Sequence, residues 1–208
     1  MRVAPEGWPF ILTAWVLEAG FLFLGYHAAA IGWLPIAVWV VAFFRDPVRD
    51  GPRGEGLIIA PADGKVVSVR LIDEPSFHGG EAQRVSIFMN VFSVHVNRYP
   101  VDGTITWRQY SPGAFVNAAA EKASLENEQS SVGIVTARGK VLVRQIAGLV
   151  ARRIITDHGE GAVVRQGERM GLIRFGSRVD IFLPANARLR VQEGQHAVAG
   201  VTVIAEWT

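Results

Sequence analysis

Residues 8–44 read WPFILTAWVLEAGFLFLGYHAAAIGWLPIAVWVVAFF, and this stretch divides the chain into two unlike parts. Its only formally charged residue is Glu18, which we expect to reach toward a polar boundary, whereas the sequence after Arg45 has a mixed, globular composition. Residues 25–27 separate two apolar halves, each shorter than the roughly 20 residues that cross a bilayer comfortably and neither with a polar stripe. We therefore expect residues 1–44 to form a hydrophobic helical hairpin that associates with a membrane, either spanning it or dipping in from one face.

Arginines flank this hairpin but are missing from its turn. Arg2 precedes the hairpin, and Arg45, Arg49 and Arg53 follow it. Because positive charge is retained on the cytoplasmic side of membranes, both ends of the hairpin are predicted to lie in the cytoplasm. The sequence thus favours a protein of the cell (inner) membrane whose larger domain lies on the cytoplasmic face.

The whole chain of 208 residues is mildly basic, with a formal net charge of +2, and it contains no cysteine. The missing thiols exclude disulfides, thiol nucleophiles, thiolate zinc sites and iron–sulfur clusters. The five histidines are scattered, with no pair spaced to bind a metal on one helix face, so we expect no metal. The small net charge is compatible with an anionic lipid surface but gives no reason to expect a nucleic-acid partner.

Residues 45–56, RDPVRDGPRGEG, are rich in glycine, proline and charge, and are predicted to be a linker to a domain over residues 57–208. Short strand-like runs separated by turn signals predict that this domain is mainly β with minor α, an antiparallel β barrel or sandwich. Its first two strands, Leu57–Ile59 and Val66–Val69, are expected to form a hairpin around Asp63-Gly64. The remaining predicted elements are a helix at Phe115–Leu125 and strands at Val85–Val96, Gly103–Tyr110, Val132–Ala137, Lys140–Ala147, Gly171–Leu183, Arg188–Val191 and Val198–Ala205. The run Gln145–Ile155 fits a strand or a short helix, and we favour the strand.

One segment inside a strand-like run is unusual: residues 174–180 read RFGSRVD. Glycine weakens the interior of a strand and often marks a bulge or a close approach of the backbone. Taken by itself, the Gly176-Ser177 pair is best explained as a β-bulge with a surface serine. The sequence contains no nucleotide-binding glycine loop, His-Glu-x-x-His helix or Gly-x-Ser-x-Gly elbow.

Seven short segments in a fixed order give this pair a different context. They are residues 43–47 (FFRDP), 60–66 (APADGKV), 88–98 (FMNVFSVHVNR), 112–117 (PGAFVN), 126–128 (ENE), 145–148 (QIAG) and 174–177 (RFGS). With them the chain resembles the phosphatidylserine decarboxylase family, in its short, membrane-associated, pyruvoyl-dependent form, over nearly all of residues 43–206. The family's usual cleavage tetrapeptide is Leu-Gly-Ser-Thr, so Phe175 and Arg178 depart from it. Many relatives also carry a second histidine where this chain has Arg98.

The resemblance implies that the chain makes its own cofactor. In this family the serine, here Ser177, attacks the carbonyl of the preceding residue, here Gly176. The chain is then cut into a β chain of residues 1–176 and an α chain of residues 177–208. Residue 177 becomes an N-terminal pyruvoyl group, and this group derived from Ser177 is the cofactor.

The resemblance also assigns roles to residues outside the cleavage site. His95 matches the base that activates Ser177, and Asp63 matches the residue that orients this histidine. On their own, His95 would be interpreted as a core or surface histidine and Asp63 as an Asp-Gly turn residue. Arg98 and Asn117 are candidates for substrate binding.

The implied reaction converts phosphatidylserine to phosphatidylethanolamine and CO2 at the membrane surface, with the pyruvoyl carbonyl as the electron sink. The partners are then the lipid, the membrane and the α and β chains of one precursor, with homo-oligomerisation left open. The hairpin fits this reaction because a diacyl substrate stays in the bilayer. Arg98, Lys122 and Arg178 are candidates to contact the lipid phosphate, although a solvated surface position is expected for each.

Two other classes of protein fit parts of the sequence. The APADGKV turn and the later Gly194-Gln195 segment resemble biotinyl or lipoyl hairpin domains, so a membrane-tethered carrier or binding module is the alternative function. Such domains present a lysine at a hairpin tip, typically beside methionine, and neither Lys65 nor Lys140 has that neighbour. A purely structural membrane protein is the third interpretation and predicts no cleavage.

Overall fold

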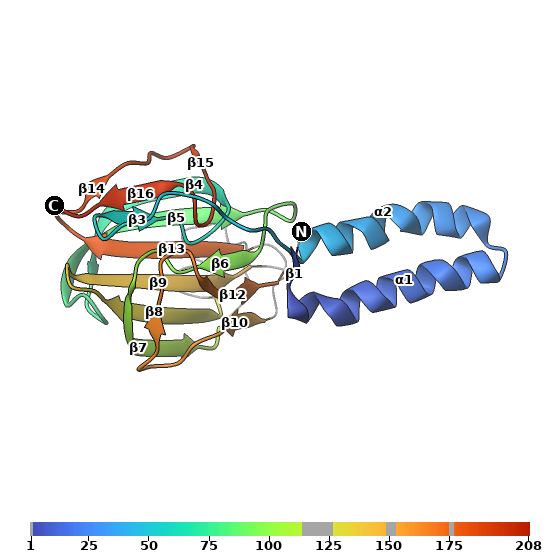
Figure 1. Ribbon diagram of the computed structural model, residues 1–208, viewed down its shortest axis with the longest axis horizontal. Helices are drawn as coiled ribbons and strands as arrows, with labels where there is room; N and C mark the ends of the chain where they lie inside the picture. The colour runs from blue at the N-terminus through green and yellow to red at the C-terminus, as the bar shows by residue number, and fades with distance from the viewer. Residues whose placement is uncertain (1, 114–126, 149–152, 175–176) are drawn as a thin grey trace. The chain divides into compact units, whose positions relative to one another are not determined.

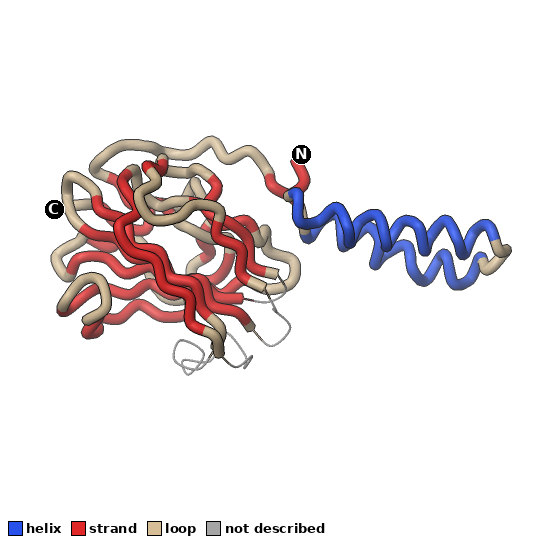
Figure 2. Tube along the Cα trace, turned by 90° about the horizontal axis from the view of Figure 1, so that it is seen from below, coloured by secondary structure: helices blue, strands red, loops and turns tan. Residues whose placement is uncertain are grey.

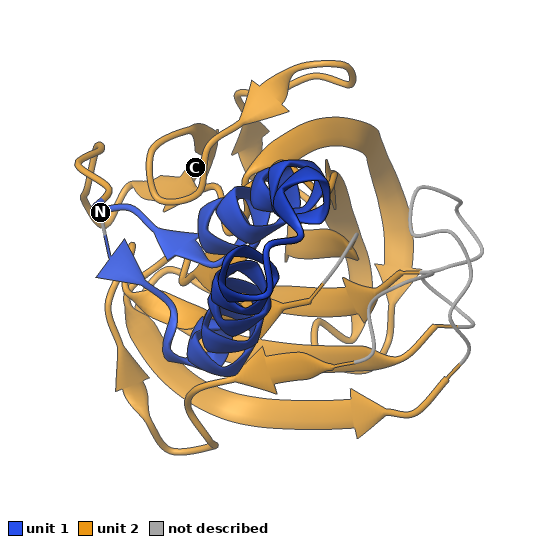
Figure 3. Ribbon diagram, turned by 90° about the vertical axis from the view of Figure 1, so that its right-hand side faces the viewer, with its two compact units in different colours: residues 1–48 blue, residues 49–208 orange. Residues whose placement is uncertain are grey.

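The computed structural model describes residues 2–113, 127–148, 153–174 and 177–208 (Figure 1). The chain divides into two compact units, residues 1–48 and 49–208 (Figure 3). This division falls inside the stretch that the sequence marks as a linker.

The first unit is a pair of antiparallel helices, drawn in blue in Figure 2. They are α1 (Trp8–Phe23) and α2 (His27–Phe43). Gly25 adopts a φ of +77° between them, a conformation that glycine accepts at no steric cost and that lets the chain reverse. The unit also contains the 3-10 turn η1 (Pro5–Gly7) and two short paired strands, β1 (Arg2–Val3) and β2 (Arg45–Asp46).

Small side chains line the contact between α1 and α2. Ala14 on α1 and Ala30 and Ala37 on α2 are buried, and the indole N–H of Trp33 donates to the carbonyl of Ala14 at 2.9 Å. Glu18 lies on the same buried side of α1 and is only 6% exposed, instead of reaching a polar boundary. The spacing of the buried α1 residues is that of one helix face.

The outer surfaces of the helices are apolar. Exposed large side chains include Trp8, Trp15, Phe23 and Ile31. Apolar surface of this kind marks contact with a membrane or with another protein. Among the described residues, no helix combines the length and the hydropathy that a membrane crossing requires.

The second unit consists of antiparallel strands in three sheets (Figures 1 and 2). The large sheet has eight strands in the order β11-β7-β8-β9-β13-β5-β4-β15, and the two smaller sheets have the orders β10-β12-β6 and β14-β16-β3. The predicted fold class, mainly β and antiparallel with a preceding helical hairpin, is confirmed. The strands are β3 (Leu57–Ile59), β4 (Gly64–Glu74), β5 (Gly80–Met89), β6 (Val96–Arg98), β7 (Gly103–Ser111), β8 (Gln129–Val135), β9 (Lys140–Ala147), β10 (Ile154–Thr156), β11 (Val163–Val164), β12 (Arg169–Ile173), β13 (Ser177–Pro184), β14 (Arg188–Leu189), β15 (His196–Ala197) and β16 (Val203–Glu206).

Side chains alternate across β13, which lies between β5 and β9. Val179 and Ile181 point into the main apolar core, on what we call the inner face of the large sheet. Phe182 points to the opposite, outer face, where it packs in a second apolar cluster with Leu142. Successive side chains of β13 therefore lie alternately on the inner and the outer face of the large sheet.

The predicted hairpin around Asp63-Gly64 is wrong. β3 pairs with β16, whereas β4 pairs with β5 and β15, so the strands on either side of the turn belong to different sheets. Gly64 makes this crossing possible, because its φ is +157° and a Cβ atom there would collide with the carbonyl oxygen of Phe88.

Two long predicted strands are each divided in the structure. The run Val85–Val96 is interrupted after Met89, and β6 begins only at Val96, so His95 lies between a turn and a strand. The run Gly171–Leu183 separates into β12 and β13. The predicted helix at Phe115–Leu125 lies outside the described residues.

Candidate active site

Ser177 is the first residue of β13 and lies in the middle of the large sheet. It pairs with Met89 at the end of β5 and with Ala147 at the end of β9. Its side chain is on the inner face and is 0% exposed. The surface position expected of an isolated Gly-Ser pair is therefore wrong for this serine.

His95 faces the hydroxyl group of Ser177 inside the protein. Nδ1 of the ring lies 3.4 Å from Oγ, and Nε2 lies 3.1 Å from the backbone carbonyl oxygen of Asn90. A carbonyl oxygen can only accept, so Nε2 carries a hydrogen, and in the neutral tautomer of this kind Nδ1 has the lone pair that faces Ser177. A hydroxyl beside a base that a third group orients is the arrangement that activates a serine.

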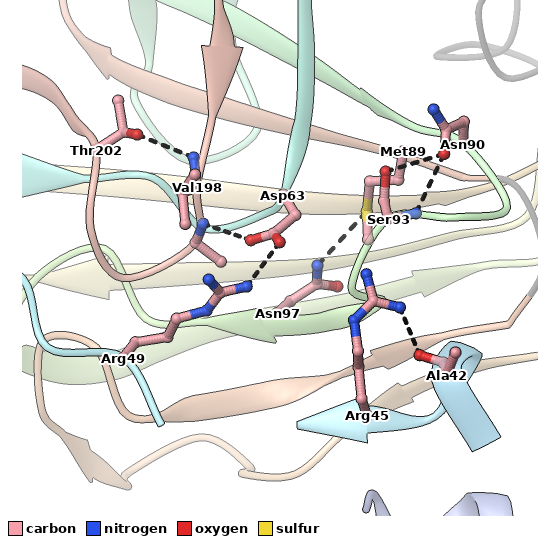
Figure 4. A network of polar contacts seen from close by, with 11 residues as sticks. Ala42, Arg45, Arg49, Asp63, Met89, Asn90, Ser93, Asn97, Val198 and Thr202 are labelled. Atoms are coloured by element: carbon pink, nitrogen blue, oxygen red, sulfur yellow. Dashed lines mark hydrogen bonds and ion pairs between the residues drawn. The ribbon is translucent and has the colours of Figure 1, made fainter. Parts of the chain in front are cut away.

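The carbonyl that orients His95 belongs to a tight turn. The side-chain oxygen of Asn90 accepts hydrogen bonds from the backbone N–H of Phe92 at 2.8 Å and of Ser93 at 3.1 Å (Figure 4 shows the bond from Ser93). The N–H of Ser93 also bonds the carbonyl of Asn90 at 3.0 Å. Sequence reasoning missed this turn, although an asparagine three residues before a serine is a signal for it.

Asp63 is bonded to other partners. Its Oδ2 accepts from Nη2 of Arg49 at 2.6 Å and its Oδ1 accepts from the backbone N–H of Ala199 at 2.7 Å (Figure 4). The far nitrogen of His95 lies at the carbonyl of Asn90, and neither of these two bonds of Asp63 goes to the ring. The structure thus brings Ser177 and His95 together but does not join Asp63 to them by a hydrogen bond, and its orienting role stays a prediction.

A chain of side-chain contacts extends from the hydroxyl of Ser177 through Met89 to buried polar residues. The hydroxyl of Ser177 lies 3.5 Å from the sulfur of Met89, and Nδ2 of Asn97 lies 3.7 Å from the same sulfur (Figure 4 shows the second contact). The side-chain oxygen of Asn97 accepts from Nε2 of Gln145 at 2.8 Å, and the Thr156 hydroxyl donates to Oε1 of Gln145 at 2.9 Å. Asn97 and Gln145 are fully buried, so this chain of contacts fixes the Met89 sulfur against the serine.

The outer face of β13 carries a buried ion pair directly after the serine. Nε and Nη2 of Arg178 donate to the two carboxylate oxygens of Asp180 at 2.6 and 2.9 Å, and Nη2 also donates to Oγ of Ser86 at 3.0 Å. Arg178 is 1% exposed and Asp180 is 0% exposed. The solvated position expected of Arg178 is therefore wrong. Arginine is almost never fully buried unless it is paired, as it is here.

Of the other predicted site residues, the structure describes only Arg98. Arg98 is half-buried at the end of β6, where its Nη1 donates to the carbonyl of Gly167 at 3.1 Å. Asn117, Lys122 and Gly176 lie outside the described residues. In the part of the chain that the structure describes, no group of three histidine, aspartate or glutamate side chains could hold a metal ion.

The lysines of the carrier interpretation have structural roles. Lys65 is exposed, but it lies within β4, paired with Phe88 and His196, and not at a hairpin tip. Lys140 is the first residue of β9, and its ammonium donates to the carbonyl of Phe77 at 2.8 Å. The comparisons below do not support a carrier either.

Comparison with known proteins agrees with the site. A family model described as phosphatidylserine decarboxylase matches residues 36–205. Three similar proteins are each named phosphatidylserine decarboxylase proenzyme. The one from Symbiobacterium thermophilum is 47% identical over 205 residues, covering 97% of this chain and 94% of the relative. The one from Azorhizobium caulinodans is 48% identical over 207 residues (97% and 88%), and the one from Paraburkholderia phymatum is 46% identical over 206 residues (98% and 96%). This chain, with a buried serine facing a histidine, belongs to the phosphatidylserine decarboxylase family.

Proposed function

We propose that the chain is a proenzyme that cuts itself between Gly176 and Ser177 and then decarboxylates phosphatidylserine. The observation that carries this proposal is the buried hydroxyl of Ser177 at 3.4 Å from Nδ1 of His95, at the position where the family's cleavage serine falls. The name proenzyme, shared by the relatives, supports the processing step.

The proposed cleavage begins as an acyl shift. Oγ of Ser177 attacks the carbonyl carbon of Gly176 while its proton passes to Nδ1 of His95. The peptide C–N bond then breaks, the nitrogen takes up the proton from His95, and an ester joins Gly176 to Oγ. His95 is thus the base of the first step and the acid of the second.

Elimination completes the cut. Loss of the Cα proton of residue 177 breaks the Cβ–Oγ bond, which leaves a carboxylate on Gly176 and a dehydroalanine at residue 177. Water then replaces the nitrogen of this residue, which leaves as ammonia. The products are a β chain of residues 1–176 and an α chain of residues 177–208 that begins with a pyruvoyl group.

The surroundings of Ser177 fit a small, uncharged keto group. The contacts of this side chain are the Met89 sulfur and the His95 ring, and the position is closed to solvent. When formed, the pyruvoyl group supplies an electrophilic carbonyl that accepts the electrons released with CO2. His95 has given its proton to the nitrogen by then, so its Nδ1 is placed to take up and return another proton within the same pocket.

Asp63, Arg98 and Asn117 complete the proposed set of site residues. The two hydrogen bonds of Asp63 support a role in fixing Arg49 and the turn after β15. Its proposed action on His95, and the proposed lipid contacts of Arg98 and Asn117, are supported by the resemblance to the family alone.

We also propose that the hairpin holds the enzyme at the cytoplasmic surface of the cell membrane. The exposed tryptophans and aliphatic side chains of α1 and α2 support this, because such surfaces bury themselves at the boundary between headgroups and acyl chains. A membrane location also matches the substrate, whose acyl chains stay in the bilayer.

Intact-mass measurement of the purified full-length chain tests the cleavage. We expect two chains that divide between residues 176 and 177, with the α chain lacking an amino terminus. Ser177→Ala is expected to stay whole and to release no CO2 from phosphatidylserine vesicles. The matched control is Ser93→Ala, which removes a hydroxyl from the neighbouring turn and should leave the position of the cut unchanged. A wild-type chain that remains whole, or decarboxylation by Ser177→Ala, would contradict the proposal.

A further inference from the structure

The pair of charges next to the cleavage residue is unusually well enclosed. Arg178 and Asp180 share one face of β13, and the guanidinium makes two charge-assisted hydrogen bonds to the carboxylate. Ser86, which lies opposite Asp180 on β5, takes a third bond from Arg178. Burying two charges costs free energy that apolar side chains of similar volume would not incur, so the pair is poorly explained as a simple source of stability.

Cleavage would change the situation of exactly these residues. In the uncut chain, residue 177 is held by a peptide bond on each side. After the cut it is a chain terminus, and the first residues of a terminus fray unless contacts tie them down. Yet the chemistry requires residue 177 to stay against His95, which lies 3.4 Å from its side chain before the cut.

The position of β13 along its neighbours must also be kept. Shifting a strand by one residue turns every side chain to the opposite face of the sheet. Such a shift would move Arg178 and Asp180 into the apolar inner core in place of Val179 and Ile181, and would turn residue 177 away from His95. The buried pair makes that shift very unfavourable, because both charges would move together into an apolar core and Arg178 would lose its bond to Ser86 on β5.

We propose that the Arg178–Asp180 pair, with Ser86, is a positioning device that anchors the new terminus of the α chain after cleavage. This inference rests on the proposed self-cleavage. It assigns the pair no part in the cutting reaction. The pair acts through the strand: the bond to Ser86 ties the first residues of β13 to β5, and the burial of both charges on the outer face keeps residue 177 on the inner face.

The test compares cut and uncut protein. Arg178→Met/Asp180→Leu removes both charges while keeping side-chain bulk. It is made in the wild-type background and in the Ser177→Ala background, which stays whole. Hydrogen exchange of the full-length chains in detergent micelles, read by mass spectrometry, is followed in peptides from residues 177–184. The control is Arg190→Met/Glu206→Gln, which removes an exposed ion pair (2.6 Å) elsewhere in the α chain.

We expect the double variant to cut itself and then to exchange at least about tenfold faster than the wild type at the start of β13. In the uncut background it should exchange at the parent rate, and the control should change neither. Equal acceleration in both backgrounds, or none in either, would overturn the inference, and so would a double variant that folds but no longer cuts itself. A wild-type chain that is never cut would instead refute the proposed function.

Discussion

The two faces of β13 differ most where the strand begins. On the inner face, the hydroxyl of Ser177 has only long contacts with uncharged partners, 3.4 Å to His95 and 3.5 Å to Met89. On the outer face, Arg178 is held by short, charged contacts of 2.6 and 2.9 Å to Asp180. Adjacent residues thus differ in how tightly they are bonded, as expected if Ser177 reacts, as proposed, and Arg178 holds the strand in place.

Removing the base from the inner face should have the largest effect. His95→Gln keeps a donor that can reach the Asn90 carbonyl but has no lone pair of comparable basicity, so self-cleavage should slow by about 10²–10⁴-fold. The half-time of cleavage, followed by gel electrophoresis of the freshly made chain, measures this. His158→Gln, which changes a histidine bonded to Tyr99 instead, should cut at the parent rate. Cleavage of His95→Gln at the parent rate would contradict the proposed role of His95 as the base.

Replacing only one residue of the Arg178–Asp180 pair should chiefly lower the free energy of unfolding. Asp180→Leu leaves the Arg178 guanidinium buried without its carboxylate, which should lower the free energy of unfolding by about 3–5 kcal/mol. Urea denaturation in the Ser177→Ala background measures it on a chain that stays whole. Arg178→Met/Asp180→Leu should lose much less, because neither charge remains. Equal losses in the two variants would mean that the apolar replacements, rather than the unpaired charge, cause the damage.

Acid should destabilise the outer face through two groups. Burial lowers the pKa of His78, more strongly than its contact with the Phe182 carbonyl at 3.2 Å raises it. Burial raises the pKa of Glu74, but the N–H groups of His78 and Phe77, the hydroxyl of Ser76 and the charge of Arg144 outweigh it, so the pKa is lowered.

Both lowered pKa values change the free energy of unfolding in the same direction. Each group takes up a proton more readily in the unfolded chain, so acid favours unfolding. Stability should fall as the pH drops below 6.5, the ordinary value for His78, and again below 4.5, the ordinary value for Glu74. Urea midpoints of Ser177→Ala between pH 8 and pH 4 measure this. His78→Gln should flatten the upper part of the profile, and an unchanged profile would assign it to other groups.

Replacing the thioether of the inner face should have the smallest effect. Met89→Leu conserves volume and apolar character, so the free energy of unfolding should fall by less than about 1.5 kcal/mol. The sulfur accepts weakly and is not a base, so we expect cleavage to slow far less than in His95→Gln. Comparison of the two cleavage half-times measures this. A loss as large as that of His95→Gln would show that the Asn97–Met89 contact controls the reactive position of the serine.

The sequence predicted the architecture where the signal is local. The apolar run 8–44 interrupted by Gly25 and the alternating runs after residue 57 each depend on neighbours along the chain, and both elements are present. The errors at Asp63-Gly64 and after Met89 concern turns, where one side-chain hydrogen bond or one glycine redirects a strand.

The site is predictable only in part for a related reason. Ser177 and His95 are 82 residues apart, and no periodic pattern in the sequence indicates that they meet. Only the resemblance to the family predicted that the two residues act together. The burial of Arg178 could not be predicted because the strand pattern does not reveal whether an outward face is covered. The Asn97–Gln145 bond links β6 with β9, two strands that belong to different sheets, so spacing along the chain carries no sign of it.

Strands from residues 177–208 are distributed through the sheets of the second unit. β13 lies between β5 and β9, β15 pairs with β4, and β16 pairs with β3, so the two fragments left by the cut would share a common fold. The uncut chain can reach that fold as a single molecule, whereas recovery of the cut protein from denaturant would be a second-order process that depends on protein concentration. The working life of the mature enzyme would accordingly be set by how slowly it unfolds.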